Sequence, residues 1–148
     1  MSKKTKRADT EGPAFLGKSI EALEGRDWGD PDYGSYVVTT THALRKKPLE
    51  KLTNEELRLA LSQRIGLPWV LELALVRLSK DLALAGDFYP GDVLAAALRL
   101  PREVWRAQAS LKDAFVLLAR EAAVSPNLFD EWDRQTIQET AEEFLAPH

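Results

Sequence analysis

Apolar residues recur every three or four positions along most of the chain, a spacing typical of amphipathic helices. The clearest helix follows Thr53, because Thr-Asn-Glu-Glu forms a capping box and apolar positions then recur as far as Gly66. A second helix is expected over residues 68–79, since Pro68 suits a first helical turn. That helix is apolar on nearly every face, which predicts a position at the centre of a helical bundle.

Shorter signals predict the other helices. Ser19 can cap and Gly25 can stop a helix within residues 18–25. Residues 35–46 begin with β-branched side chains, but no second strand candidate exists to pair with them, so we interpret them as a helix that Pro48 ends. A further helix is expected over residues 93–99, and a short turn that carries Trp105 follows from Pro101. Ser110 and Asp113 are expected to cap the next helix. The last helix has the apolar stripe Ile137, Ala141, Phe144 and Leu145, and Pro147 ends it.

Every segment with a clear signal is therefore a helix, and short loops join them. This pattern predicts an all-α fold, a single compact bundle of about six to eight helices over residues 14–148. Residues 1–13 are expected to form a flexible basic leader.

The net charge of −3 is unevenly distributed. Lys3, Lys4, Lys6 and Arg7 precede every acid, and without them residues 8–148 hold 16 basic against 23 acidic residues, a net charge of −7. An acidic body repels nucleic acid, so we expect no nucleic-acid partner. The segment 130–148 is also acidic, and the sequence leaves open whether it is solvated or docks a partner.

The chain offers little for catalysis. It has no cysteine and only two histidines, His42 and His148, so we expect no metal, no cofactor and no histidine-based catalytic cluster. Residues 12–19 match the phosphate-loop pattern G-x-x-x-x-G-K-[ST], but no strand is predicted before them and Pro13 removes one amide. We interpret that match as a coincidence.

No signal peptide or membrane span is expected. The most apolar segment, residues 67–78, holds only 12 residues and carries Glu72 and Arg77, whereas about 20 apolar residues are needed to span a bilayer. We therefore expect a soluble, cytoplasmic protein with no membrane partner.

Two turn-rich loops combine aromatic side chains with acids, which is the chemistry needed to bind a basic protein surface. An alternative interpretation buries the aromatic residues under the bundle and leaves the acids as helix caps. The candidate binding residues are Trp28, Asp30, Asp32 and Tyr33 in the first loop, and Asp87, Phe88, Tyr89 and Asp92 in the second.

Several stretches, in order, resemble the immunity proteins of bacterial contact-dependent growth inhibition (CDI) systems, over about residues 19–107. Trp105 also lies where that family pattern has a bulky aromatic residue. The stretches are Ile-Glu-Ala-Leu-Glu-Gly at 20–25, Trp-Gly-Asp-Pro at 28–31, His-Ala-Leu-Arg-Lys-Lys-Pro-Leu at 42–49, Leu-Arg-Leu at 57–59, Gln-Arg-Ile-Gly-Leu-Pro at 63–68 and Gly-Asp-Phe-Tyr-Pro-Gly-Asp-Val-Leu at 86–94.

The resemblance implies a small cytoplasmic binder without catalysis of its own, which blocks the toxin domain of a large exported effector. The acidic body favours a basic toxin, such as a nuclease. We expect the protein to be a monomer or to form a 1:1 complex with this toxin. Two other functions stay open. A small hydrolase would bring carboxylates with raised pKa values together in a pocket, and a helix-turn-helix protein would bind DNA.

Overall fold

Helices form nearly all of the regular structure. The computed structural model describes residues 12–26 and 35–147, and in these two ranges it has α-helices, short 3₁₀ helices and no strand. The leader up to residue 11 and the first candidate loop, with Trp28, Asp30, Asp32 and Tyr33, lie outside the described residues. The α-helices are α2 (Ile20–Glu24), α3 (Tyr36–Lys46), α4 (Asn54–Ser62), α5 (Leu67–Lys80), α6 (Asp92–Leu98), α7 (Arg102–Ala107), α8 (Ala109–Val124) and α9 (Arg134–Leu145); the 3₁₀ helices are η1 (Ala14–Gly17), η2 (Leu49–Lys51) and η3 (Pro126–Leu128).

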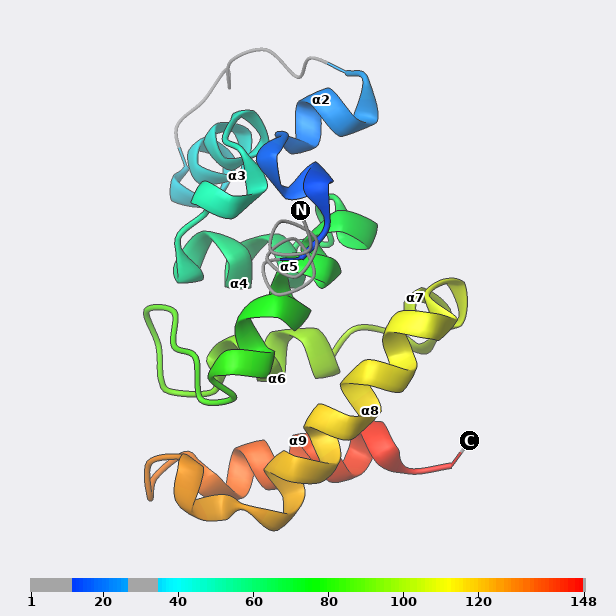
Figure 1. Ribbon diagram of the computed structural model, residues 1–148. Helices are drawn as coiled ribbons and strands as arrows, with labels where there is room; N and C mark the ends of the chain where they lie inside the picture. The colour runs from blue at the N-terminus through cyan, green and yellow to red at the C-terminus, as the bar shows by residue number, and fades with distance from the viewer. Residues whose placement is uncertain (1–11, 27–34, 148) are drawn as a thin grey trace, which may run out of the picture.

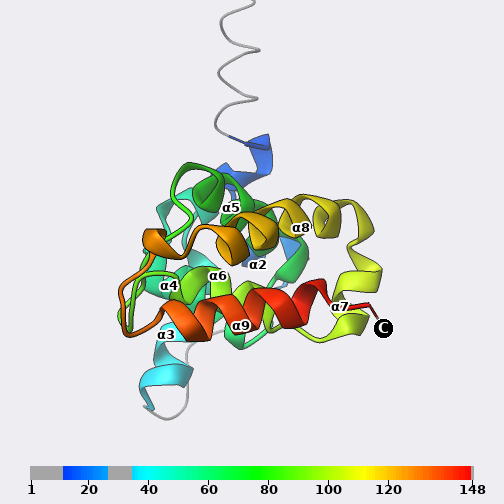
Figure 2. The ribbon, with the colours of Figure 1, turned by 90° about the horizontal axis from the view of Figure 1, so that it is seen from below.

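The helices stack in three tiers along the molecule. In Figure 1, α2 and α3 lie at the top, α4, α5 and α6 form the middle, and α8 and α9 form the base, with α7 at one side. Seen from below in Figure 2, α8 and α9 run antiparallel, and α6 packs against both α4 and α9. The prediction of an all-α bundle is confirmed.

α5 lies at the centre, as its apolar sequence predicts. It contacts α4, α6 and α8 as well as η1 and η2. Val70, Leu71 and Ala74 are fully buried on it, and Leu78 is nearly so. Among the described residues, none of the helices is both long enough and apolar enough to span a bilayer.

Two of the three predicted helix caps, at Ser19 and Thr53, are present, and Ser35 forms a further cap that was not predicted from the sequence. The hydroxyls of Ser19, Ser35 and Thr53 each accept a hydrogen bond from the backbone N–H three residues on. The expected cap at Ser110 is wrong. α8 begins at Ala109, one residue after Gln108, which makes no side-chain cap. α7 ends at Ala107, so a single residue separates the two helices and leaves no room for a capped turn.

The capping box at the start of α4 gives a first prediction. Thr53 Oγ1 accepts the N–H of Glu56 at 3.0 Å, while Glu56 Oε1 accepts the N–H of Thr53 at 2.8 Å. We expect Thr53→Ala to lower the free energy of unfolding by about 0.5–2 kcal/mol, measured by urea unfolding. Thr53→Ser keeps the acceptor and is the control. An alanine variant as stable as the wild type would show that this cap contributes nothing.

The phosphate-loop match folds as the 3₁₀ helix η1. Two of its backbone N–H groups are already used, because Leu16 donates to the carbonyl of Pro13 and Lys18 donates to that of Phe15. No strand precedes it among the described residues, and the helix that follows has only five residues. The interpretation of this match as a coincidence agrees with that conformation.

Candidate functional site

The loop between α5 and α6 (residues 81–91, the α5–α6 loop) is held in shape from inside by one carboxylate. Asp92, at the first position of α6, is 3 % exposed. Its oxygens accept the backbone N–H groups of Gly86 at 2.6 Å, Phe88 at 3.0 Å and Tyr89 at 3.4 Å. Asp92 therefore determines the conformation of the loop and offers no free oxygen edge on the surface.

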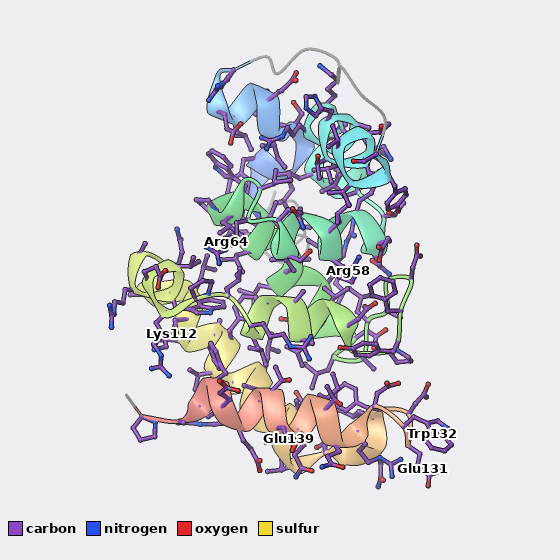
Figure 3. The ribbon with its side chains drawn as sticks, turned by 180° about the vertical axis from the view of Figure 1, so that it is seen from behind. Arg58, Arg64, Lys112, Glu131, Trp132 and Glu139 are labelled. Atoms are coloured by element: carbon purple, nitrogen blue, oxygen red, sulfur yellow. The ribbon has the colours of Figure 1, made fainter. Side chains whose placement is uncertain are left out.

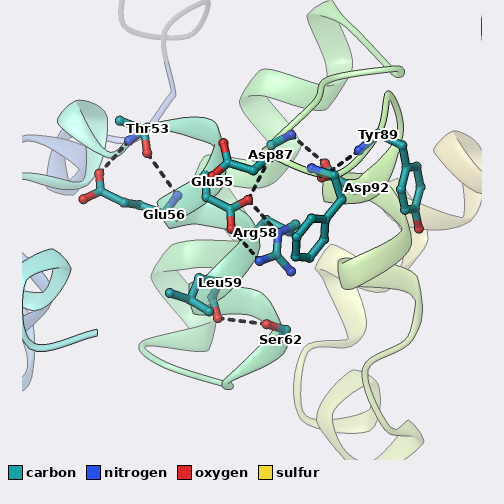
Figure 4. Close-up of polar contacts among 11 residues, drawn as sticks. Thr53, Glu55, Glu56, Arg58, Leu59, Ser62, Asp87, Tyr89 and Asp92 are labelled. Carbon is teal, nitrogen blue, oxygen red and sulfur yellow. Dashed lines mark hydrogen bonds and ion pairs between the residues drawn. The ribbon is translucent and has the colours of Figure 1, made fainter. Parts of the chain in front are cut away.

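A second carboxylate fixes the loop from α4. Glu55 Oε1 accepts the N–H of Asp87 at 2.9 Å, and the same carboxylate binds Arg58 through two hydrogen bonds of 2.7 and 2.5 Å. Figure 4 shows these contacts converging on one side of α4. A Cβ added to Gly86 would lie 2.6 Å from Glu55 Oε1, so only glycine lets the loop pass this close to α4.

This network presents Phe88 to solvent. The ring is 69 % exposed, and the guanidinium of Arg58 lies over it, 4.3 Å from its centroid. Large aromatic side chains are usually buried in a folded protein. An aromatic ring such as that of Phe88, which its neighbours keep exposed to solvent, is therefore unusual. A cation–π contact restricts the ring without covering it. Tyr89 is half-buried and Asp87 is exposed.

A hollow of about 500 Å³ separates the loop from α3. Its lining includes the exposed Tyr36 of α3, Glu55 and Glu56 of α4, and Asp87 of the loop. Tyr36 follows Ser35, which comes directly after the first candidate loop in the sequence. The start of α3 and the α5–α6 loop therefore border the same hollow.

The pKa values of the two glutamates in this hollow are lowered. The Arg58 guanidinium lowers the pKa of Glu55 through its hydrogen bonds, although burial opposes the shift. Burial also opposes ionisation of Glu56, but the hydrogen bonds from the Thr53 N–H and from Lys47 together outweigh it and lower its pKa. The hydrolase hypothesis requires raised pKa values here, so the direction of both shifts disfavours a general acid.

These lowered pKa values predict loss of stability in acid. A carboxylate whose pKa is lower in the folded than in the unfolded state stabilises the fold at pH values above its unfolded pKa of about 4.3. This stabilisation is lost as the pH falls through the folded pKa. We expect Glu55→Gln to flatten the fall in urea-unfolding free energy below about pH 4.3 relative to the wild type. Glu142→Gln, at an exposed position of α9, is the control. An unchanged pH profile for Glu55→Gln would contradict the assignment.

Several parts of this site were not predicted from the sequence. Glu55, Arg58 and Tyr36 were absent from the candidates, and the only signal was the spacing of three between Glu55 and Arg58, typical of a helix-surface ion pair. Among the described residues, no cluster of three or more His, Cys, Asp or Glu side chains could hold a metal ion.

Comparison with known protein families gives one match. A family model described as CDI immunity proteins matches residues 22–114, well over half of the chain. The chain belongs to the CDI immunity protein family. The resemblance noted from its sequence motifs is confirmed, over nearly the same residues. Neither a curated protein nor a solved structure is similar enough to this family member to give a match.

The family match includes the α5–α6 loop and the residues that hold it. It ends at residue 114, early in α8, so the rest of α8 and all of α9 lie outside it. α9 nevertheless packs closely on α8, and Gly91 at the end of the loop approaches it, because a Cβ there would lie 2.9 Å from Ile137 of α9. α9, which lies outside the family match, therefore packs against the end of the α5–α6 loop.

Proposed function

We propose that this CDI immunity protein neutralises its toxin by binding the toxin domain with the α5–α6 loop and the neighbouring end of α3, and so occludes the active site or substrate groove. The observation that carries the proposal is Phe88, an exposed aromatic ring held in place by Arg58. Rigid aromatic side chains that fill a partner's pocket supply much of the energy at protein interfaces. Preorganisation also lowers the entropy cost of binding.

The charge around Phe88 favours a basic partner. Asp87 is exposed beside it, whereas the charge of Glu55 is already matched by Arg58. A nuclease is basic where it binds phosphates, so Asp87 would stand in for a phosphate of the nucleic-acid backbone. Acidic steering predicts association that slows steeply as salt is added. Asp92 and Tyr89 contribute by shaping the loop, and Trp28, Asp30, Asp32 and Tyr33 remain candidates in the first loop.

We further propose that the protein has no catalytic activity. The carboxylates Glu55, Glu56 and Asp87 do border one hollow, as the hydrolase hypothesis requires, but the lowered pKa values of the two glutamates leave neither as a proton donor near neutral pH. The proposal thus describes a cytoplasmic, monomeric binder that forms a 1:1 complex without a cofactor or nucleic acid.

The experiment that tests this function is co-expression with the toxin domain encoded immediately upstream. We expect growth to be restored by the wild-type immunity protein, and purified mixtures to give a 1:1 complex by light scattering. The toxin alone should degrade RNA or DNA, and this degradation should stop at equimolar immunity protein. Persistent toxicity, or a neighbour that is no toxin, would refute the proposal. Retarded migration of DNA at low salt would favour the DNA-binding alternative.

A further inference from the structure

A second hollow lies beside the helix pair α8 and α9, at the end opposite the turn that precedes α9. It has a volume of about 710 Å³ and is bordered by α7, the first half of α8 and the end of α9. A smaller hollow of about 290 Å³ runs from Phe88 and Tyr89 to Arg99, Leu100 and Pro101, and these last three residues also line the larger hollow. The two hollows therefore adjoin at these three residues, and the smaller one reaches the α5–α6 loop.

Basic side chains dominate the larger hollow, which we name the cationic groove. Two acids, Glu103 and Glu143, also line it. Its cations come from the end of α6, from α7 and from one face of α8: Arg99, Arg102, Arg106, Lys112 and Arg120. In an acidic protein, this concentration of positive charge in one concavity is unexpected.

These cations are not used to hold the fold together. Elsewhere Lys47 is paired with Glu56 and Arg58 with Glu55, both at hydrogen-bond distance. Within the described part of the chain, Arg102, Arg106, Lys112 and Arg120 make no ion pair, and Arg99 makes only a 3.5 Å contact with the hydroxyl of Thr140. Five like charges around one hollow repel one another, so an anionic ligand would relieve that repulsion.

Trp105 supplies an independent observation in the same groove. The indole lines the hollow, is 3 % exposed, and packs between Phe115 and Phe144, with ring centroids 5.1 and 5.3 Å away. Its Nε1–H has no acceptor among the described residues. Buried indole N–H groups usually have a partner, so this orphaned donor indicates a site that is completed by an acceptor from another molecule.

We propose that the cationic groove binds an acidic segment of the toxin domain, whose carboxylates contact Arg102, Arg106 and Lys112. This inference rests on the proposed function and names a second contact with the same partner. Basic residues of the toxin would meet Asp87 at the α5–α6 loop, and acidic residues would meet the cations of the groove.

The lining of the groove favours a peptide over a nucleic acid. Leu100, Val116 and Phe144 supply apolar surface for neighbouring side chains of a peptide. Glu103 and Glu143 would repel a continuous phosphate backbone, whereas a mixed peptide sequence can match them with a basic residue. Single-stranded nucleic acids also need exposed aromatic rings for stacking, and Trp105 is buried.

Figure 3 places the groove relative to the acidic part of the surface. Lys112 lies at one end of the α8–α9 pair, and Glu131 and Trp132 lie at the opposite end. Arg64 and Arg58, which line the smaller hollow, appear on the same face as Lys112. The cationic groove is thus well separated from the turn that carries Glu131 and Trp132. A partner that spans the groove and the α5–α6 loop need not approach that turn.

The decisive experiment compares charge reversals of equal size in the full-length protein. R102E/R106E changes two groove cations, whereas the control Lys18→Glu/Lys51→Glu changes two exposed lysines outside the groove. Circular dichroism and thermal melting establish that both variants are folded. Titration calorimetry with the purified toxin domain should show the dissociation constant raised at least tenfold by the groove variant and less than twofold by the control.

A zero-length carbodiimide cross-linker provides a second readout, because it joins a lysine amine to a carboxylate in contact with it. We expect mass spectrometry to find Lys112 joined to an Asp or Glu of the toxin, and Lys112→Arg to lose that product. If the wild type binds and both double variants bind equally well, the groove proposal is overturned while the proposed function stands. If the wild type does not bind, the proposed function itself fails.

Two further outcomes would assign the groove to another ligand. Binding of single-stranded or duplex DNA that disappears in the R102E/R106E variant would replace the peptide by a nucleic acid. A wild-type dimer that this variant converts to a monomer would identify a second copy of the chain as the occupant. Either result would overturn the proposal that the toxin fills the groove.

Discussion

Replacing Phe115 with alanine should lower the free energy of unfolding by about 3–5 kcal/mol, the range found for large-to-small changes of buried aromatic residues. Phe115 is fully buried on α8, and its ring packs against Trp105 of α7, which in turn contacts Phe144 of α9. Removing this ring takes away the α8 member of an aromatic cluster that joins three helices.

Urea unfolding followed by circular dichroism measures this loss. Leu117→Ala is the matched control, because Leu117 lies on the same helix but is 64 % exposed, and its change should cost less than about 1 kcal/mol. Equal losses for the two variants would mean that α8 does not pack against α7 and α9 as described. Phe115→Leu, which keeps most of the volume, should lie between the wild type and the alanine variant.

The helices could be predicted where a local signal determines them. Thr53 and Glu56 specify the start of α4 by contacts within one turn, so no distant residue is needed to recognise it. The β-branched start of α3 was also interpreted correctly, since no partner strand was available in the sequence. At Ser110 the local signal failed, because the packing of α7 directly before α8 moved the start of the helix.

The sequence predicted which loop forms the candidate site, but not which of its residues are exposed and which are buried. The sequence places Asp87, Phe88 and Asp92 close together and cannot tell which of them is exposed. That distinction depends on Glu55, which is 32 residues before Asp87 and binds its backbone N–H. Asp92 is internal and accepts N–H groups of the loop rather than of a helix, whereas Phe88 is exposed and not buried under the bundle.

The cationic groove could not be seen in the sequence because its charges are scattered. Residues 99–120 hold five basic and two acidic residues, a net charge of +3, but the sequence alone does not show that cations from three helices line one concavity. Folding brings the end of α6, α7 and α8 around one concavity and directs their cations into it. The body charge of −7 thus conceals a local surface of the opposite sign.

The largest effect on function is expected from Phe88→Ala, which should raise the dissociation constant for the toxin domain about 30-fold or more, as for an interface hot spot of at least about 2 kcal/mol. The fold should be unaffected, since the ring is 69 % exposed and its main contact is with Arg58. The loss should appear mainly in the dissociation rate, because it removes a short-range contact and leaves the steering charges in place.

Surface plasmon resonance with the immobilised toxin domain separates the two rates. Val124→Ala is the control, since Val124 is a 78 % exposed apolar residue at the end of α8 and lines none of the hollows described above. Asp87→Lys should behave differently from Phe88→Ala, because it reverses a steering charge and should lower the association rate most strongly at low salt. If Phe88→Ala binds as tightly as Val124→Ala, the exposed ring is not an anchor, and the toxin contacts a different face of the immunity protein.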